Sequence, residues 1–351
     1  MTTSTIIKSW QFSHTIGRRT HEHNDSKLGK TGGCALPMDI AVDDENMIYI
    51  LNRGFGYSVE GFDGDIGNRI GKTTIDEDHI GDFARHAMTW PNSLAISSDG
   101  KIYCSDEYEN AIYVFKSDRI YTFPTADHEN EVILKWGENG DNPGQFDGPT
   151  GLTFNTEGDL YVVDRGNNRV QIFSPKGSYI SSWGKEGTEE GEFCNPWGIS
   201  IDKQGNIYVA DWGNNRVQIF DYKGQYISTL GTSGDANQRL SHPAHVAVDK
   251  DGDIYISDWG NKRVQIFDCD GNFIQSLKGD ATDFSKAALY VLERAALANT
   301  MAKDTLKQKP NLMDGFKEFG RPTGIAISKD NQIIIADSKS RLQVYSKHIG
   351  R

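Results

Sequence analysis

Several things are scarce in this chain of 351 residues, and each scarcity excludes a class of protein. The four cysteines, at positions 34, 104, 194 and 269, contain no CxxC pair, so free packed thiols are expected rather than a disulfide framework. Lys and Arg (37) are outnumbered by Asp and Glu (49), and a net charge of −12 argues against a nucleic-acid surface. No apolar leader or membrane-length apolar run is present. We therefore expect a cytoplasmic protein with no membrane partner.

What the sequence does contain is a repeat. The segment PTGLTFNTEGDLYVVDRGNNRVQIF at 149–173 returns as PWGISIDKQGNIYVADWGNNRVQIF at 196–220 and as PAHVAVDKDGDIYISDWGNKRVQIF at 243–267, a period of 47 residues. Weaker copies begin at Pro37, Pro91 and Pro322. A fixed period in the forties, with several short strands in each unit, is typical of a β-propeller. Six copies predict an all-β, six-bladed propeller that forms a single domain over residues 1–351.

Each unit has the pattern of a four-stranded antiparallel sheet. In the fourth unit, apolar residues alternate at Ile199 and Ile201, and again at Ile207 and Val209, as half-buried strands require. Gly and Asn between the strands supply turns with positive φ. An Asp ends the second strand in five units, and three of these units carry an Arg five residues later. Because this residue recurs in nearly every unit, we interpret the Asp as a structural cap and ion-pair partner.

The last unit lacks a fourth strand, since the chain ends six residues after Tyr345. At the amino terminus, Ile6–Trp10 aligns with the outer strand Tyr179–Trp183 of the third unit. We therefore predict that an N-terminal strand completes the last blade, which would join the two termini and leave no long exposed edge.

Residues 283–318 interrupt the repeat between the fifth and sixth units. They are rich in Ala and Leu, with apolar residues near helical spacing and Pro310 close to the end. We predict a helical insertion here. It could serve as a lid over one rim of the ring, as a helix packed on the side of the ring, or as a contact between copies of the chain.

The repeat, with its Gly-Asn turn, Tyr-Val-x-Asp strand end and Gly-Asn-Asn-Arg-Val-Gln-Ile-Phe, resembles the NHL repeat. Over nearly its full length the chain is similar to six-bladed NHL-type propellers. That resemblance implies the fold. It also implies protein- or RNA-platform roles, usually beside a RING or B-box zinc module, and no such Cys/His module is present here. Peptidylglycine amidating lyases and, more distantly, gluconolactonase-type calcium-dependent lactonases have related rings.

The functional site is expected where the six units differ. The residues after each proline and those after the second strand should share one rim of the ring, and at these positions the units are dissimilar. We predict a mixed polar and aromatic pocket at this channel mouth. Its ligand-binding residues would be Asp39, Asn92, Tyr108, Trp197, Trp212 and Trp259. The alternative for Trp212 and Trp259 is packing between blades.

Several histidines also fall on this rim. His21 and His23 lie in the long first loop, His86 lies shortly before Pro91, and His245 lies just after Pro243. Imidazoles from separate blades can bind zinc or a similar ion, and the related amidating lyases use such ligands. Asn92 in WPNSLAI is similar to a Pro-Asn pair of the lactonases. We therefore include a divalent metal (zinc, iron or calcium) among the expected cofactors, and for His245 the alternative is a hydrogen-bonded channel residue.

Two functions remain open from the sequence. The first is a soluble small-molecule enzyme of the lyase or hydrolase type. Arg53 and Arg165 would hold an anionic substrate, and His245 or Glu107 would act as the general base. The second is a noncatalytic scaffold for a protein or peptide, with the helix and the tryptophans as anchors.

Overall fold

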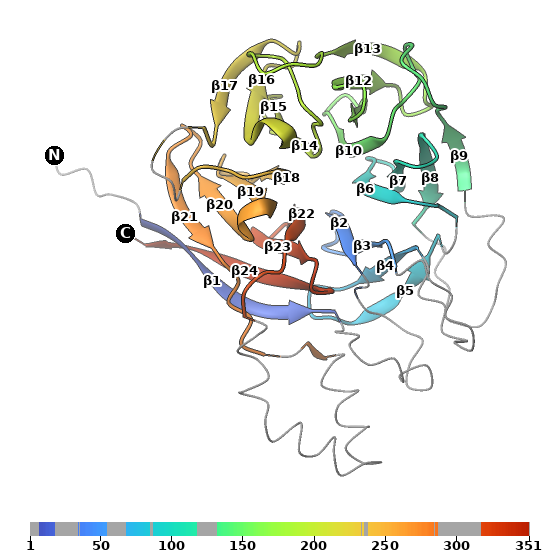
Figure 1. The fold of residues 1–351 in the computed structure, drawn as a ribbon. Helices are drawn as coiled ribbons and strands as arrows, with labels where there is room; N and C mark the ends of the chain where they lie inside the picture. Colours follow the sequence, from blue (N-terminus) through green and yellow to red (C-terminus); the bar gives the residue numbers. More distant parts are fainter. Residues whose placement is uncertain are drawn as a thin grey trace.

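The computed structural model describes residues 7–17, 34, 36–54, 68–84, 87–117, 132–232, 234, 238–283, 285–286 and 317–350. Six four-stranded antiparallel sheets stand side by side around a central channel, as the sequence predicts (Figure 1). The chain is therefore a six-bladed β-propeller. The innermost strand of each blade begins at its recurring proline, or shortly after it in blade four.

Blades one, two and three follow the chain order from the channel outward. Their strands are β2 (Pro37–Val42), β3 (Ile48–Asn52), β4 (Arg69–Thr73) and β5 (His79–Phe83); β6 (Pro91–Ile96), β7 (Lys101–Asp106), β8 (Ala111–Lys116) and β9 (Val132–Trp136); and β10 (Pro149–Phe154), β11 (Leu160–Asp164), β12 (Arg169–Phe173) and β13 (Tyr179–Trp183).

Blades four and five repeat this order, and each has a one-turn 3-10 helix after its second strand. They comprise β14 (Ile199–Ile201), β15 (Ile207–Asp211), η3 (Trp212–Asn214), β16 (Arg216–Phe220) and β17 (Tyr226–Leu230); and β18 (Pro243–Val248), β19 (Ile254–Asp258), η4 (Trp259–Asn261), β20 (Arg263–Phe267) and β21 (Phe273–Leu277). Blade six contains β22 (Pro322–Ile327), β23 (Gln332–Asp337), β24 (Arg341–Gly350) and β1 (Ile7–Ile16).

The apolar core is divided among the spaces between blades. It forms six clusters, and each one combines buried residues of two neighbouring blades, including the pair formed by blades six and one. Alternate side chains of each strand face opposite neighbours, so every blade contributes to two clusters. The ring thus has no end at which apolar surface is left uncovered.

The predicted closure by the amino terminus is confirmed. Strand β1 pairs antiparallel with β24 from Ile7 opposite Gly350 to Ile16 opposite Leu342, six residues beyond the predicted end. The buried Trp10 donates a hydrogen bond to Tyr255 of blade five (Nε1 to Oη, 3.2 Å). Both terminal strands are therefore attached to blade five as well as to each other.

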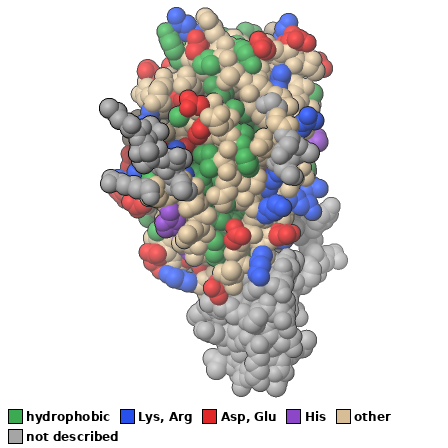
Figure 2. Space-filling model, turned by 90° about the vertical axis from the view of Figure 1, so that its left-hand side faces the viewer, with side chains coloured by type: hydrophobic (Ala, Val, Ile, Leu, Met, Phe, Trp, Pro, Cys, Tyr) green, Lys and Arg blue, Asp and Glu red, His purple; other side chains and the backbone are tan. Residues whose placement is uncertain are grey.

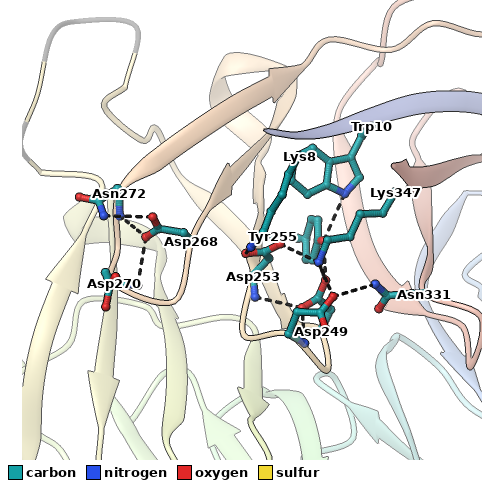
Figure 3. A network of polar contacts seen from close by, with 11 residues as sticks. Lys8, Trp10, Asp249, Asp253, Tyr255, Asp268, Asp270, Asn272, Asn331 and Lys347 are labelled. Atoms are coloured by element: carbon teal, nitrogen blue, oxygen red, sulfur yellow. Dashed lines mark hydrogen bonds and ion pairs between the residues drawn. The ribbon is translucent and has the colours of Figure 1, made fainter. Parts of the chain in front are cut away.

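Figure 3 shows a second attachment of the same two strands to blade five. The Lys347 ammonium lies 2.6 Å from Asp249, 2.7 Å from Asp251 and 2.7 Å from Asp253, and Lys8 lies 2.6 Å from Asp253. The Lys347 side chain is almost fully buried, and an ammonium in that position needs these carboxylates to replace the water it has lost. The closure thus combines strand pairing with buried charge.

The recurring Asp has the structural role that the repeat predicts. In blade four, Asp211 accepts a hydrogen bond from Arg216 (2.8 Å), and the Arg216 guanidinium also donates to the backbone oxygens of Thr188, Glu189 and Glu192. Blades three, five and six contain the equivalent ion pairs Asp164–Arg169, Asp258–Arg263 and Asp337–Arg341. Each pair holds the loop that enters its blade, so these residues belong to the scaffold.

The predicted helical insertion at 283–318 lies almost entirely outside the described residues, so the structure gives it no support. All four cysteines are described, and none forms a disulfide. Within the described ranges, no helix has the length and apolar character needed to cross a bilayer. The outer wall on the side of β21 and the two termini carries acidic and basic side chains together (Figure 2).

Candidate functional site

A cavity of about 520 Å³ opens at the rim where the innermost strands begin. All six blades contribute to its wall, and its volume is within the range of small-molecule sites. Its lining side chains include Asp39, Arg53, Asn92, Ser93, Trp197, Trp212, His245, Trp259, Lys262 and Arg321. Rim positions that differ between blades therefore meet in one cavity.

One side of the cavity is a wall of three indoles. Trp212 lies between Trp197 and Trp259, with ring centroids 6.2 and 6.3 Å away. Trp212 and Trp259 begin the helices η3 and η4, which turn the chain at the rim just after β15 and β19. Trp212 thus packs against both of its neighbours, and all three half-buried rings also line the cavity.

His245 and Asp39 face each other across the channel. The Nε2 atom of His245 lies 3.6 Å from Oδ1 of Asp39, and Asp39 is almost fully buried. Nδ1 of His245 is buried and has no hydrogen-bond partner among the described residues. The other oxygen of Asp39 accepts hydrogen bonds from the Ser93 hydroxyl (2.6 Å) and from the Leu94 amide (2.9 Å). Asp39 is therefore fixed in place before any ligand arrives, and it orients the imidazole beside it.

The two arginines expected to clamp a substrate are instead joined through Glu107. The guanidinium of Arg53 lies 3.6 Å from Glu107, and that of Arg165 lies 4.0 Å from it. Glu107 also accepts a hydrogen bond from Asn92 Nδ2 (2.6 Å), and Asn92 Oδ1 accepts one from Trp197 Nε1 (2.9 Å). Burial lowers the pKa of the Arg53 guanidinium, and the Glu107 carboxylate opposes this effect. The network thus supports the cavity wall and neutralises part of its charge.

Each arginine of this network also lies over an indole ring. The Arg53 guanidinium is 4.5 Å from the ring centroid of Trp90, and that of Arg165 is 4.8 Å from Trp197. On the opposite side of the mouth, the Arg321 guanidinium lies 4.0 Å from the ring centroid of Trp259. Three Arg–Trp pairs therefore surround the opening, each stabilised by the attraction of a cation to an aromatic face.

The predicted site residues fall into three groups. Seven line the cavity: Asp39, Arg53, Asn92, Trp197, Trp212, His245 and Trp259. Glu107 and Arg165 stand behind the wall, in contact with residues that line it. Tyr108 is 72% exposed and is not among the lining residues. His21, His23 and His86 lie outside the described residues.

Lys262 and Arg321 also line the cavity, and the sequence interpretation missed both. A signal for Lys262 was present, because the motif Gly-Asn-Asn-Arg of blades three and four reads Gly-Asn-Lys-Arg at 260–263. Arg321 directly precedes the recurring proline, at a position that varies between blades.

The described residues supply few possible ligands for the predicted metal site. Of its four predicted histidines only His245 lies in the described part of the chain, and Asp39 is the one carboxylate within 4.0 Å of it there. Across those described residues, no group of three or more His, Cys, Asp or Glu side chains could hold a metal ion. The described residues therefore do not form a metal site.

A family model described as "NHL repeat" matches residues 146–173, 193–220 and 240–267, which lie in blades three, four and five and the loops that enter them. Two curated relatives match over short stretches. E3 ubiquitin-protein ligase TRIM71 of Rattus norvegicus is 43% identical over 47 residues, 13% of this chain and 6% of that protein. NHL repeat-containing protein 3 of Homo sapiens is 30% identical over 84 residues, 23% of this chain and 24% of that protein. The matches thus span a quarter of these relatives or less.

Solved propellers resemble nearly the whole chain. A streptogramin B lyase structure superposes with a TM-score of 0.57 at 13% sequence identity, covering 97% of this chain and 98% of that one. An identity this low supports the shared fold and nothing finer. Together with the six sheets and the three matched repeats, it gives one conclusion: the protein is a six-bladed β-propeller that carries NHL repeats in blades three, four and five.

Proposed function

We propose that the channel mouth is the site of a small-molecule enzyme of the lyase or hydrolase type, in which His245 is the general acid or base. The observation that carries this proposal is the His245–Asp39 pair inside a cavity of ligand size. The Asp39 carboxylate beside Nε2 fixes the orientation of the imidazole. A positioned imidazole can give a proton to a substrate or take one from it.

Other side chains of the site are less suited to the chemical step. The Ser93 hydroxyl donates a hydrogen bond to Asp39 and accepts one from the Leu152 amide, and the residue is almost fully buried, so it is held in the wall of the cavity. Glu107 is held by Asn92, Arg53 and Arg165 behind the wall. This arrangement favours His245 over Glu107 as the group that exchanges a proton with the substrate.

The charges at the mouth favour an anionic substrate. Of the three cations that line the cavity, Arg53 is partly neutralised by Glu107 behind the wall, which leaves Lys262 and Arg321 against the single lining carboxylate of Asp39. This excess occurs in a protein whose net charge is −12, so it opposes the overall balance. Positive charge concentrated in a cleft attracts anions and raises their local concentration. The streptogramin B lyase structure supports the idea that a ring of this shape can host a lyase, as an analogy of fold.

The test is substrate depletion from a cell metabolite extract, followed by mass spectrometry. We expect the wild-type protein to consume an anionic compound that a His245→Gln variant, with an unchanged melting temperature, leaves intact. Lys203→Asn is the control, because Lys203 is exposed in the β14–β15 turn at the opposite face of the ring. Depletion that is unaffected by His245→Gln, or no depletion by the wild type, would contradict the proposal.

A second function is favoured by a different observation. Trp90 and Tyr108 are exposed on the rim of blade two, and large exposed aromatics are typical of protein-binding surfaces. The curated relatives include an E3 ubiquitin-protein ligase. If this rim binds a protein, crosslinks should map to Trp90 and Tyr108, and Tyr108→Ser should remove them while His245→Gln should not.

A further inference from the structure

Lys262 occupies a backbone position that three other blades give to asparagine. Its φ is 55°, and Asn110, Asn168 and Asn215 have φ values of 53°, 51° and 54° at the equivalent positions of blades two, three and four. This left-handed region is unfavourable for residues with a β carbon, and asparagine enters it far more readily than lysine. Blade five therefore carries a lysine where the local backbone favours asparagine.

The asparagines have a defined task at this position. The side-chain oxygens of Asn110, Asn168 and Asn215 accept hydrogen bonds of 2.7 to 2.8 Å from the amide that precedes the next blade's proline. In blade six the corresponding amide belongs to Arg321, and it donates to Asp337 Oδ1 instead (3.2 Å). The bridge is thus replaced at this junction, as it is between blades one and two, where the Trp90 amide donates to Asp106 Oδ2 (2.9 Å). Position 262 is therefore not needed to hold the next blade.

The position of Lys262 at the cavity indicates its role. Both Lys262 and Arg321 line the cavity and are exposed to solvent at its mouth. In the described part of the structure, neither has a carboxylate within 4.0 Å, whereas Arg53 and Arg165 share Glu107. Arg321 is held against the face of Trp259 at the edge of the tryptophan wall. The accessible positive charge of the mouth is therefore on blades five and six.

We propose that Lys262 and Arg321 form the anion subsite of the channel mouth and that the ligand is an aromatic acid. Its flat ring would lie on the wall formed by Trp197, Trp212 and Trp259, and its carboxylate, sulfonate or phosphate would lie between the two cations. This subsite replaces Arg53 and Arg165 as the position of the anion. It rests on the proposed function only in requiring that the cavity binds a small molecule, and it does not depend on the chemistry of His245.

The experiment compares two fluorescent probes of similar shape, anilinonaphthalene sulfonate and its uncharged counterpart phenylnaphthylamine. We expect Lys262→Asn to weaken binding of the sulfonate about fivefold, the size expected for one partly exposed charge pair, and to leave the neutral probe unchanged. The same variant should melt at the wild-type temperature or above it, because asparagine suits the left-handed position. Arg321→Gln should also weaken the sulfonate, and Lys203→Asn should not.

The outcomes separate the two proposals. If wild type and Lys262→Asn bind the sulfonate equally well, the anion subsite is wrong and the pocket stands. If the wild type binds neither probe, the pocket and the subsite are both wrong. If Lys262→Asn weakens both probes and lowers the melting temperature, Lys262 is a structural residue and the subsite is again wrong.

Discussion

The interior of blades three to five and the channel mouth are built from the same repeat, yet their charged side chains differ in the partners that they have. In the interior, one arginine such as Arg216 donates to a carboxylate and to three backbone oxygens. At the mouth, Lys262 and Arg321 have no carboxylate partner within the described ranges, and both line the cavity. The ion pairs of the interior therefore belong to the scaffold, whereas the cations of the mouth can be reached by a ligand.

Residues that recur from blade to blade and residues that interrupt the repeat have different roles. Residues that recur, such as Asp164, Asp211 and Asp258, fix the architecture of every blade. Residues that interrupt the repeat, such as Lys262, are placed at a local backbone cost. If this division is correct, scaffold substitutions should reduce stability strongly, and mouth substitutions should reduce ligand binding alone.

The largest effect is expected where the scaffold closes. Deleting residues 1–12 removes the buried Trp10, Lys8 and six of the nine residue pairs between β1 and β24. The loss should exceed the ~3–5 kcal/mol that truncation of one buried large aromatic side chain costs. Calorimetry should show a sharply lower melting temperature. An unchanged value would mean that the ring does not need β1 for its stability.

The next largest effect is expected inside a blade. Asp211→Ala leaves the guanidinium of Arg216, which is 8% exposed, without its carboxylate. Breaking a buried ion pair on one side costs about 3–5 kcal/mol, because the remaining charge stays desolvated. Urea unfolding should measure this loss. The matched control is Glu190→Ala, which removes one exposed carboxylate from the loop that Arg216 holds, and it should have almost no effect.

Much of this scaffold could be predicted from the sequence. The six copies of the repeat give the number of blades, and the pattern within each copy gives the strand order and the Asp–Arg pairs. The closure was also predictable, since the last unit lacked a strand that Ile6–Trp10 could supply. The electrostatics of the site could not be predicted. Arg53, Glu107 and Arg165 come from three different blades, so their mutual neutralisation depends on distances that no local pattern encodes. The departure of Lys262 from asparagine is visible in the sequence, but only the structure places this residue at the cavity.

A smaller effect on stability is expected at the mouth. His245→Gln removes an imidazole that touches Asp39, yet Asp39 keeps its hydrogen bonds from Ser93 and Leu94. The free energy of unfolding should therefore change by about 1 kcal/mol or less, in contrast to Asp211→Ala. Urea unfolding of the two variants under the same conditions checks this. A loss for His245→Gln as large as that for Asp211→Ala would place His245 in the scaffold.

The smallest effect is expected in blade two, which lacks the Asp–Arg pair because Ala111 replaces the arginine. Blade two instead has a more exposed cluster, in which Glu109 accepts hydrogen bonds from Thr89, Tyr113 and Lys135. Partial burial acts to raise the pKa of Glu109, but these hydrogen bonds outweigh it and lower the pKa from 4.5 to about 2. Since the folded-state pKa is the lower one, the cluster stabilises the fold above pH 4.5 and loses its contribution as the pH falls towards 2.

Glu109→Gln should therefore destabilise the protein at about pH 7 by ~1 kcal/mol or less, since water and salt screen a cluster at the surface. The difference from wild type should shrink at about pH 3, where the wild-type cluster begins to be protonated. Urea unfolding at the two pH values measures this. A constant difference at both would mean that the cluster acts through packing and not through charge, and that blade two has no electrostatic substitute for the pairs of its neighbours.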